Sequence, residues 1–262
     1  MNDKKDVKLR PSYTILQNWL LNAGNAIYIG KALSEVPVDI FVIVVHHGEP
    51  DINFVSCRMV PPTVLTADVL EDLLLDGFYG IRMGSSISHL AANRHHWPPH
   101  MIYAMSLGMG GRWYTPCEKG STSIKGPVGY SLGKKCGSAC NQVKLQREHQ
   151  ITDIARACSR PAFNNTFYQD RVFHALVTYD VTAELVFTYD SPRNLRAKLC
   201  KAKTNATDVE YTFVAADIQL EDAKGTCGYG PYPRLYMLKK LAAFFAFNYT
   251  SAGRERQCRA VT

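Results

Sequence analysis

Apolar residues near the start of the chain recur with the spacing of a helix. The apolar positions of this segment are Ile15, Leu16, Trp19, Leu20, Ala23 and Ile27. Ser12 is placed to act as the N-cap, and the opposite face carries side-chain amides rather than charges. Amides cost less to bury than charges when they find partners. The pattern predicts an amphipathic helix that either caps its own core or reaches into another subunit.

The next segment has the pattern of strands. An almost continuous apolar, β-branched run at 36–45 predicts a strand, and a polar turn at 46–51 predicts a strand returning at 52–60. Thr66 then has the character of an N-cap, with leucines at helical spacing behind it. We therefore expect a strand pair followed by a short helix at 66–74.

The rest of the chain alternates irregular and patterned stretches. Residues 77–135 are rich in Gly, Ser and Pro, which favours protruding loops, and residues 142–157 have weak helical character. The clearest pattern is a hairpin formed by two alternating segments. The strands predicted here are 101–107, 112–115, 171–179, 183–189 and 209–220, and a final helix is predicted at 234–249.

Composition places the chain among ordinary globular proteins. It has 262 residues, of which 46% are hydrophobic and 20% charged, and no stretch approaches the roughly 18 apolar residues that span a bilayer. The charged start does not resemble a secretory signal. We predict one domain over 1–262, with a helical arm at 1–34 and a core at 35–262, made in the cytosol.

The eight cysteines are then expected to be free thiols, because cytosolic proteins rarely keep disulfides. Cys136 and Cys140, four residues apart, suggest either half of a metal site or a thiol nucleophile. A thiol hydrolase would pair one of them with His149 or His174. The segment lacks a second cysteine pair at metal-site spacing, and Asn141 departs from the papain-type signature.

Other polar clusters do not match a known catalytic or metal-binding pattern. The histidines of 94–100 are interrupted by prolines, the glycines of 108–111 lack a Walker lysine, and the carboxylate pairs at 71–72 and 221–222 fall where solvent-facing positions are expected. We expect a flexible glycine loop and surface histidines. We predict no catalytic residue and no metal ligand, hence a protein that is not an enzyme.

The net charge of +7 permits nucleic-acid binding. The basic cluster that such a protein would use is Arg193, Arg196, Lys198, Lys201 and Lys203. A solvated surface explains the same residues. The 14 tyrosines are a second distributed feature, since with the lysines they would make the chain strongly negative near pH 11.

The order of these elements resembles that of the polyhedrins of cypoviruses. The resemblance rests on the amphipathic start, the segment 35–42 with its polar turn, the short helix 66–74, and a Gly/Pro/Tyr loop leading into an aromatic-rich helix at 235–249. It covers the two ends of the chain and leaves 77–157 unmatched. Diagnostic motifs are absent from the match.

The resemblance implies an α+β fold, an antiparallel β-sandwich with flanking helices and a projecting N-terminal amphipathic helix. It implies homotrimers that form a crystal lattice around virus particles, an occlusion body in the host cell cytoplasm that dissolves in alkali. No cofactor is required, although bound nucleotides are implied at positions that no motif identifies, and no membrane is involved. The expected assembly residues are Ile15, Leu16, Trp19, Leu20 and Ile27. Soluble nucleic-acid binding stays the alternative function.

Overall fold

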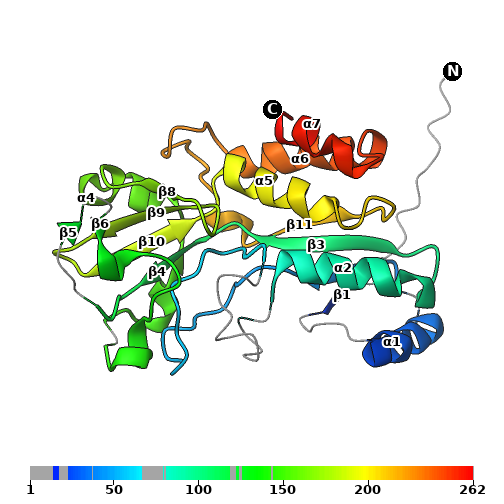
Figure 1. Cartoon of the computed structure of the whole chain (residues 1–262), viewed down its shortest axis with the longest axis horizontal. Coiled ribbons are helices and arrows are strands. Elements are labelled where there is room, and N and C mark those ends of the chain that lie inside the picture. Colours follow the sequence, from blue (N-terminus) through cyan, green and yellow to red (C-terminus); the bar gives the residue numbers. More distant parts are fainter. Residues whose placement is uncertain are drawn as a thin grey trace, which may run out of the picture.

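Two main β-sheets lie side by side in the computed structural model of this chain, and helices cover one of them (Figure 1). The structure describes residues 14–17, 23–36, 38–66, 79, 81–118, 122–123, 126–142 and 144–261. The strands are β1 Thr14–Gln17, β2 Ile40–Val44, β3 Ile102–Gly108, β4 Gly111–Tyr114, β5 Thr122–Ser123, β6 Gly126–Pro127, β7 Ile151–Thr152, β8 Tyr168–Asp170, β9 Ala175–Asp180, β10 Leu185–Tyr189 and β11 Thr212–Ala216. The α-helices are α1 Ala23–Glu35, α2 Met83–Asn93, α3 Ala155–Cys158, α4 Pro161–Asn164, α5 Pro192–Lys203, α6 Pro233–Phe247 and α7 Glu255–Arg259.

The first sheet contains four strands in the order β1-β2-β3-β11, and every neighbouring pair is parallel. Ile40 of β2 lies between Thr14 of β1 and Ile102 of β3 in the register. The five residues of β2 are all Ile, Val or Phe. Such an unbroken apolar run is typical of a parallel strand that is covered on both faces.

A layer of helices packs on one face of this sheet, in the neighbour order α1, α2, α5, α6. Met105 of β3 and Leu199 of α5 belong to one buried apolar cluster. Helix α5 begins at a regular cap, because Ser191 Oγ accepts a hydrogen bond from Asn194 N at 3.2 Å and Pro192 occupies the first turn. The order of helices follows the order of strands, as crossover connections between parallel strands require.

The second sheet is antiparallel, in the order β7-β4-β10-β9-β8. The turn between β9 and β10 is closed by Asp180, whose Oδ1 accepts hydrogen bonds from Thr182 N at 2.9 Å and Ala183 N at 3.1 Å. Glu184 completes it with a φ of 56°. An aspartate that bonds the backbone two residues on is a common turn device, so this hairpin is specified locally.

Three ion pairs have side chains at most 1% exposed, and the first two connect segments of the two sheets. They are Arg112–Asp51, Lys198–Asp190 and Arg234–Glu221, with N–O distances of 2.8, 2.5 and 2.7 Å. Arg234 also donates to the main-chain oxygen of Met109, between β3 and β4. Buried charges persist only when they are paired and hydrogen-bonded, so these contacts fix how the two sheets meet.

All eight cysteines form disulfides, so the prediction of free thiols is wrong. The pairs are Cys57–Cys136, Cys117–Cys140, Cys158–Cys227 and Cys200–Cys258. Three of them tie loops around the antiparallel sheet, and the fourth ties α5 to α7. The prediction of thiols rested on a location inferred from the chain's start, which carries no information on the geometry of the cysteines.

The predicted antiparallel β-sandwich is wrong, since one of the two main sheets is parallel. The strand predicted at 36–45 is confirmed as β2, but the return predicted at 52–60 is turn and loop. The chain instead reaches β3 by way of α2, which places β3 parallel to β2. The strand and helix predictions that correspond to β3, β4, β9, β10, β11 and α6 are confirmed, with shifted ends.

The predicted N-terminal helix is confirmed over 23–27 but wrong at its start. Residues 14–17 form strand β1, the helix begins at Ala23, and Ser12 lies outside the described residues, as does most of the helix predicted at 66–74. Tertiary pairing with β2 overrides the local helical spacing. The division into a single domain stays a prediction. Within the described residues, every helix falls short of the length and hydropathy that crossing a bilayer requires.

Candidate functional site

Polar side chains gather where three neighbouring parallel strands end. We call this place the carboxyl-end rim and define it by His46 after β2, Ser106 near the end of β3 and Asp217 after β11. Register places β11 beside β3 and β3 beside β2. In parallel α/β folds, ligands bind at this end of the sheet, because the loops that follow the strands are free to carry chemistry.

His46 is fixed in place by its neighbours. Its Nδ1 lies 2.9 Å from Ser106 Oγ, and the side chain is 9% exposed. Gly48 and Gly108 border the ring, and a Cβ added at Gly48 would lie 2.9 Å from His46 Nε2. The two glycines therefore leave room for an imidazole that a larger neighbour would displace.

The electrostatic surroundings keep His46 neutral near physiological pH. Burial lowers the pKa of His46, while hydrogen bonding to Ser106 and the charge of Asp217 oppose that shift. Asp217 is exposed and adopts a left-handed backbone with φ 55°. A neutral imidazole with one donor and one acceptor nitrogen, next to a hydroxyl and a carboxylate, can bind a polyhydroxylated or amide-bearing ligand.

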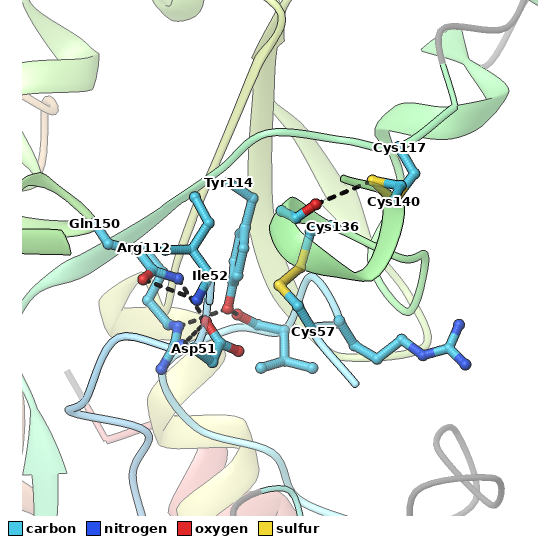
Figure 2. The surroundings of a disulfide bond; sticks show 12 residues. Asp51, Ile52, Cys57, Arg112, Tyr114, Cys117, Cys136, Cys140 and Gln150 are labelled. Carbon is cyan, nitrogen blue, oxygen red and sulfur yellow. Dashed lines mark hydrogen bonds and ion pairs between the residues drawn. A yellow bond between two sulfur atoms is a disulfide. The ribbon is translucent and has the colours of Figure 1, made fainter. Parts of the chain in front are cut away.

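Behind the rim, Asp51 is the centre of a buried network (Figure 2). Its carboxylate accepts hydrogen bonds from Arg112, Tyr79 and Gln150. Arg112 Nε donates to Tyr114 Oη at 2.6 Å, and both the Arg112 and Asp51 side chains are fully buried. The network thus joins the loop after β2 to β4 and β7 of the second sheet.

The same network positions the histidine pair. Arg112 Nη1 donates to the main-chain oxygen of His47 at 2.5 Å, and His47 N donates to Pro62 O at 2.7 Å. Burial lowers the pKa of His47 well below its usual value, and the charge of Arg112 adds to that shift. A fixed His47 backbone in turn fixes His46, so the Asp51–Arg112 pair supports the rim without reaching it.

Carboxylates near the rim are mostly engaged already. Asp51 is bound by Arg112, Glu221 by Arg234, and Asp222 accepts hydrogen bonds from the backbone of Thr226 and Cys227. Glu221 and Asp222 both belong to the segment that follows β11. Burial raises the pKa of Glu221, and its ion pair with Arg234 works in the opposite direction.

A groove of about 380 Å³ lies beside the loop that follows β11. Tyr229 and Tyr236 line it and are 50% and 60% exposed, with Pro231 between them and Arg196 at its side. An exposed tyrosine offers a flat apolar ring next to a hydroxyl. The groove is therefore a second place where a ring-shaped ligand could pack.

The residues considered for thiol or metal chemistry do not form a site. Cys136 is bonded to Cys57 and Cys140 to Cys117, which leaves neither available as a nucleophile for His149 or His174. Among the described residues, no group of three or more histidines, cysteines or carboxylates could hold a metal ion. The glycine segment at 108–111 is not a flexible loop. It connects β3 to β4, and a Cβ on Gly111 would lie 2.0 Å from the ring of Phe187.

Helix α5 carries all five residues of the basic cluster proposed for nucleic acid, but it does not expose them equally. Lys198 is fully buried against Asp190 and the main-chain oxygen of Thr63, and Lys203 donates to the main-chain oxygens of Ala206 and Val209. Two of its five cations thus serve the fold. The carboxylate pair at 221–222, expected to face solvent, is buried as well, whereas the pair at 71–72 lies outside the described residues.

The assembly residues are scattered over different elements. Ile15 and Leu16 lie in β1, Ile27 lies on α1 with 55% exposure, and Trp19 and Leu20 lie outside the described residues. Their role in assembly stays a prediction. Sequence reasoning missed the rim, although part of the signal existed: His46 follows the strand predicted at 36–45, and Ser106 lies near the end of the one predicted at 101–107. Asp217 fell inside the strand predicted at 209–220, which the structure ends at Ala216.

Comparisons with known proteins identify the fold. No family model and no curated protein matches this chain. Among solved structures, the group IV chitinase of Ostrinia furnacalis with allosamidin has a TM-score of 0.60 at 13% identity, over 88% of this chain and 57% of that one. Human YKL-39, a pseudo-chitinase with retained chitooligosaccharide binding, has a TM-score of 0.60 at 12% identity, over 90% and 58%. A chitinase of Rhizomucor miehei gives 0.53 at 12%, over 87% and 60%.

These neighbours are chitinase-like proteins of glycoside hydrolase family 18, with a TIM-barrel-like fold. This chain shares the TIM-barrel-like fold, and it spans less than two thirds of the length of each of these three proteins. The resemblance to cypovirus polyhedrins is therefore wrong. The comparisons also contradict what this resemblance implied: an occlusion body, a homotrimer, a crystal lattice and virus particles as partners. The nucleic-acid alternative finds no support.

Proposed function

We propose that this chain binds chitooligosaccharides at the carboxyl-end rim and does not hydrolyse them. The observation that carries the proposal is the convergence of His46, Ser106 and Asp217 at the ends of three adjacent parallel strands. TIM-barrel proteins place their ligand sites at this end of the sheet. Human YKL-39, which shares the fold, is a pseudo-chitinase that retains chitooligosaccharide binding.

The chemistry of the rim suits such a ligand. N-acetylglucosamine units present hydroxyl and amide groups, and the rim offers the exposed carboxylate of Asp217, whose charge acts on the buried His46–Ser106 pair. The side chain of Asp217 is exposed, so it can accept hydrogen bonds from sugar hydroxyls. Hydrogen bonds to a charged acceptor are roughly twice as strong as neutral ones, which makes Asp217 the residue with the largest expected effect on affinity.

The state of the carboxylates supports binding without hydrolysis. Glycoside hydrolysis commonly uses two carboxyl groups on either side of the scissile bond, one of them a general acid. In the described part of the chain, the buried carboxylates near the rim are held by Arg112, Arg234 or backbone amides. A carboxyl group whose oxygens are occupied by an arginine or by backbone amides is not free to protonate a glycosidic oxygen. Binding of this kind needs no cofactor.

The disulfides support a place of action outside reducing compartments. Four disulfides use all eight cysteines of the chain. Disulfides persist in oxidising environments and are rare where glutathione keeps thiols reduced. We therefore place the protein in an oxidising compartment, in place of the host cell cytoplasm that the sequence suggested.

Calorimetric titration with chitotetraose tests the proposal. The variant Asp217→Asn keeps a residue that tolerates the left-handed backbone and removes the charge, and we expect about 10-fold weaker binding. Asp39→Asn is the matched control, because Asp39 is exposed at the opposite end of the sheet, next to β2. Its affinity should stay within about twofold of the parent.

Two results would count against the proposal. Absence of heat at millimolar chitotetraose would remove the ligand class, and equal weakening by Asp39→Asn would remove the rim as its site. Mass spectrometry of the same mixture tests hydrolysis separately. Chitotetraose should persist unchanged, whereas shorter oligomers that appear in proportion to protein would show an enzyme.

A further inference from the structure

Three segments of the chain have the acceptor pattern for N-linked glycans, an asparagine followed two residues later by threonine. They begin at Asn164, Asn205 and Asn248, and no proline follows any of these asparagines. The pattern marks surface segments of secreted proteins and means little in a protein that stays in the cytosol. The four disulfides favour an oxidising compartment, and they therefore change what these three segments indicate.

Two of the segments combine an exposed asparagine with an anchored neighbour. Asn205 lies in the turn after α5, and Asn248 is the residue at which α6 ends. Both asparagines are exposed, whereas the residues that follow them, Ala206 and Tyr249, are only 1% and 3% exposed. A glycan is bulky and solvated, so a folded protein can carry one only on an exposed asparagine. Both positions meet that condition.

The turn that carries Asn205 is held without the help of its side-chain amide nitrogen. Lys203 Nζ donates to the main-chain oxygens of Ala206 at 3.1 Å and Val209 at 2.5 Å. Asn205 Oδ1 accepts a hydrogen bond from Thr204 Oγ1 at 3.3 Å. Among the described residues, none bonds to Asn205 Nδ2. A sugar on this nitrogen would therefore displace no contact of the fold.

The end of α6 leaves Asn248 equally available. Its main-chain nitrogen donates to Phe244 O at 2.8 Å, and its main-chain oxygen accepts from Thr250 N at 3.2 Å. Tyr249 fixes the segment, because its Oη donates to Cys200 O at 3.0 Å. In the part of the chain that the structure describes, the side chain of Asn248 makes no hydrogen bond. The nitrogen that an N-linked glycan would occupy is thus free at both helix ends.

The segment at Asn164 differs, because its threonine is part of the fold. Thr166 Oγ1 lies 2.6 Å from Thr178 Oγ1 and donates to the main-chain oxygen of Tyr179 at 2.8 Å. These contacts join the end of α4 to β9. A substitution of Thr166 would alter this packing together with the acceptor pattern, so we base the proposal on Asn205 and Asn248.

Both asparagines lie at the end of the parallel sheet opposite the rim. Asn205 precedes β11, and α6 runs back beside β11 from the carboxyl end of that strand to its start (Figure 1). Thr212 at the start of β11 and Phe247 at the end of α6 line one groove. Asp217, which belongs to the rim, follows the other end of β11. Glycans on these asparagines would therefore leave the rim accessible to a saccharide.

We propose that Asn205 and Asn248 carry N-linked glycans. The donor is a lipid-linked oligosaccharide: a bond forms between asparagine Nδ2 and the anomeric carbon of the first sugar, the lipid diphosphate leaves with the bonding electrons, and the amide loses a proton. These two sites rest on the oxidising compartment proposed above, because a chain that stays in the cytosol does not meet such a donor. They are independent of the ligand at the rim.

Peptide mass spectrometry of the chain, secreted from insect cells behind a cleavable leader, tests the two sites. An amidase that releases N-linked glycans, applied in heavy-oxygen water, converts each glycan-bearing asparagine into a labelled aspartate. Asn205 and Asn248 should both be labelled in most molecules. Asn53 is the matched control, because it is exposed but lies outside the acceptor pattern. Absence of label at either site would overturn the proposal, as would equal labelling of Asn53, which would indicate chemical deamidation.

Threonine variants test the pattern without changing the asparagines. Thr250→Ala should remove the glycan of Asn248, whereas Thr250→Ser keeps the pattern and should keep the glycan. Thr250 is exposed, so both variants should fold. Thr207→Ala and Thr207→Ser make the same comparison at Asn205. A glycan that survives both alanine changes, or one that both serine changes remove, would contradict the assignment.

Thiol titration of the denatured secreted chain separates this proposal from the one on which it rests. Absence of free thiols together with unmodified Asn205 and Asn248 would overturn the glycan sites alone. Eight free thiols with unmodified asparagines would overturn the oxidising compartment as well. Chitotetraose affinity before and after glycan removal should agree within about twofold. A larger gain on removal would contradict the placement of the glycans opposite the rim.

Discussion

The two sheets of this protein differ in how completely their faces and edges are covered. The antiparallel sheet is surrounded by loops that three disulfides hold, and its turns are closed by their own aspartates. In the part of the chain that the structure describes, the parallel sheet is covered by helices on one face, its edge strands β1 and β11 each pair with a single strand, and Ile102 and Val214 are exposed on the other face. The contrast teaches that the antiparallel region is held by its own local contacts, whereas the parallel region, where we propose the binding site, is more exposed.

The largest effect should come from the network that joins the two regions. Arg112→Met keeps the length of the side chain but leaves Asp51 buried without its cation. Removing one partner of a buried ion pair costs about 3–5 kcal/mol, so we expect urea unfolding to show a loss of that order. The exposed pair of Arg94 with Asp208 is the control, because exposed pairs contribute at most about 1 kcal/mol. An equal loss for Arg94→Met and Arg112→Met would contradict the role given to the buried network.

The disulfides allow a direct comparison of the regions. Cys57–Cys136 and Cys200–Cys258 have sequence separations of 79 and 58 residues. Loop-closure entropy predicts a cost of about 4 kcal/mol for either when both cysteines become alanine, with a difference of only about 0.3 kcal/mol.

The two disulfide variants should differ in where they loosen the chain. Without Cys57–Cys136, hydrogen exchange should accelerate in the loop 51–63 that carries Asp51, whereas without Cys200–Cys258 it should accelerate in α7. Loosening of α7 alone in both variants would contradict the expectation that Cys57–Cys136 holds the loop that carries Asp51.

Through the histidine pair, acid should lower the free energy of unfolding gradually and by less than the changes above. His46 and His47 have folded-state pKa values below the usual value of about 6.5. Below pH 6.5 the unfolded chain therefore binds more protons than the folded one, and the free energy of unfolding falls as pH falls. Each histidine contributes a slope of up to about 1.4 kcal/mol per pH unit until its folded pKa is reached.

Urea unfolding between pH 7.5 and pH 5.5 measures that slope. The double variant His46→Gln/His47→Gln should flatten it, although both glutamines will also change stability at pH 7.5. His95→Gln/His96→Gln is the matched control, since these two histidines lie on an exposed turn. A slope that only the control flattens would show that the acid sensitivity arises elsewhere.

Local patterns predicted much of the secondary structure but not how the strands pair. The sequence pattern predicted β2 from its apolar run, β9 and β10 from their alternation, and α6 from its helical spacing. Helix α2 was missed because Gly84, Ser85 and Ser86 make its first turns resemble a loop. Helix α5 was missed as well, because its cations were interpreted as a solvated cluster. Without these two crossover helices nothing in the predicted elements indicated a parallel sheet, and the resemblance to polyhedrins supplied the wrong fold class.

The candidate site was harder to predict for a different reason. Asp51 and Arg112 are 61 residues apart in sequence, and Lys198 reaches Thr63 across 135. Such contacts have no local pattern, and the cations of α5 have the character of a solvated cluster until the fold buries two of them. The disulfide partners were unpredictable in the same way, because cysteine spacing alone does not determine connectivity.

A crystal structure of the 262-residue chain soaked with chitotetraose tests the central claim most directly. The account predicts sugar density at the carboxyl-end rim, within hydrogen-bond distance of Asp217 and close to His46. Density confined to the groove beside Tyr229 and Tyr236, or density at the opposite end of the parallel sheet, would contradict it.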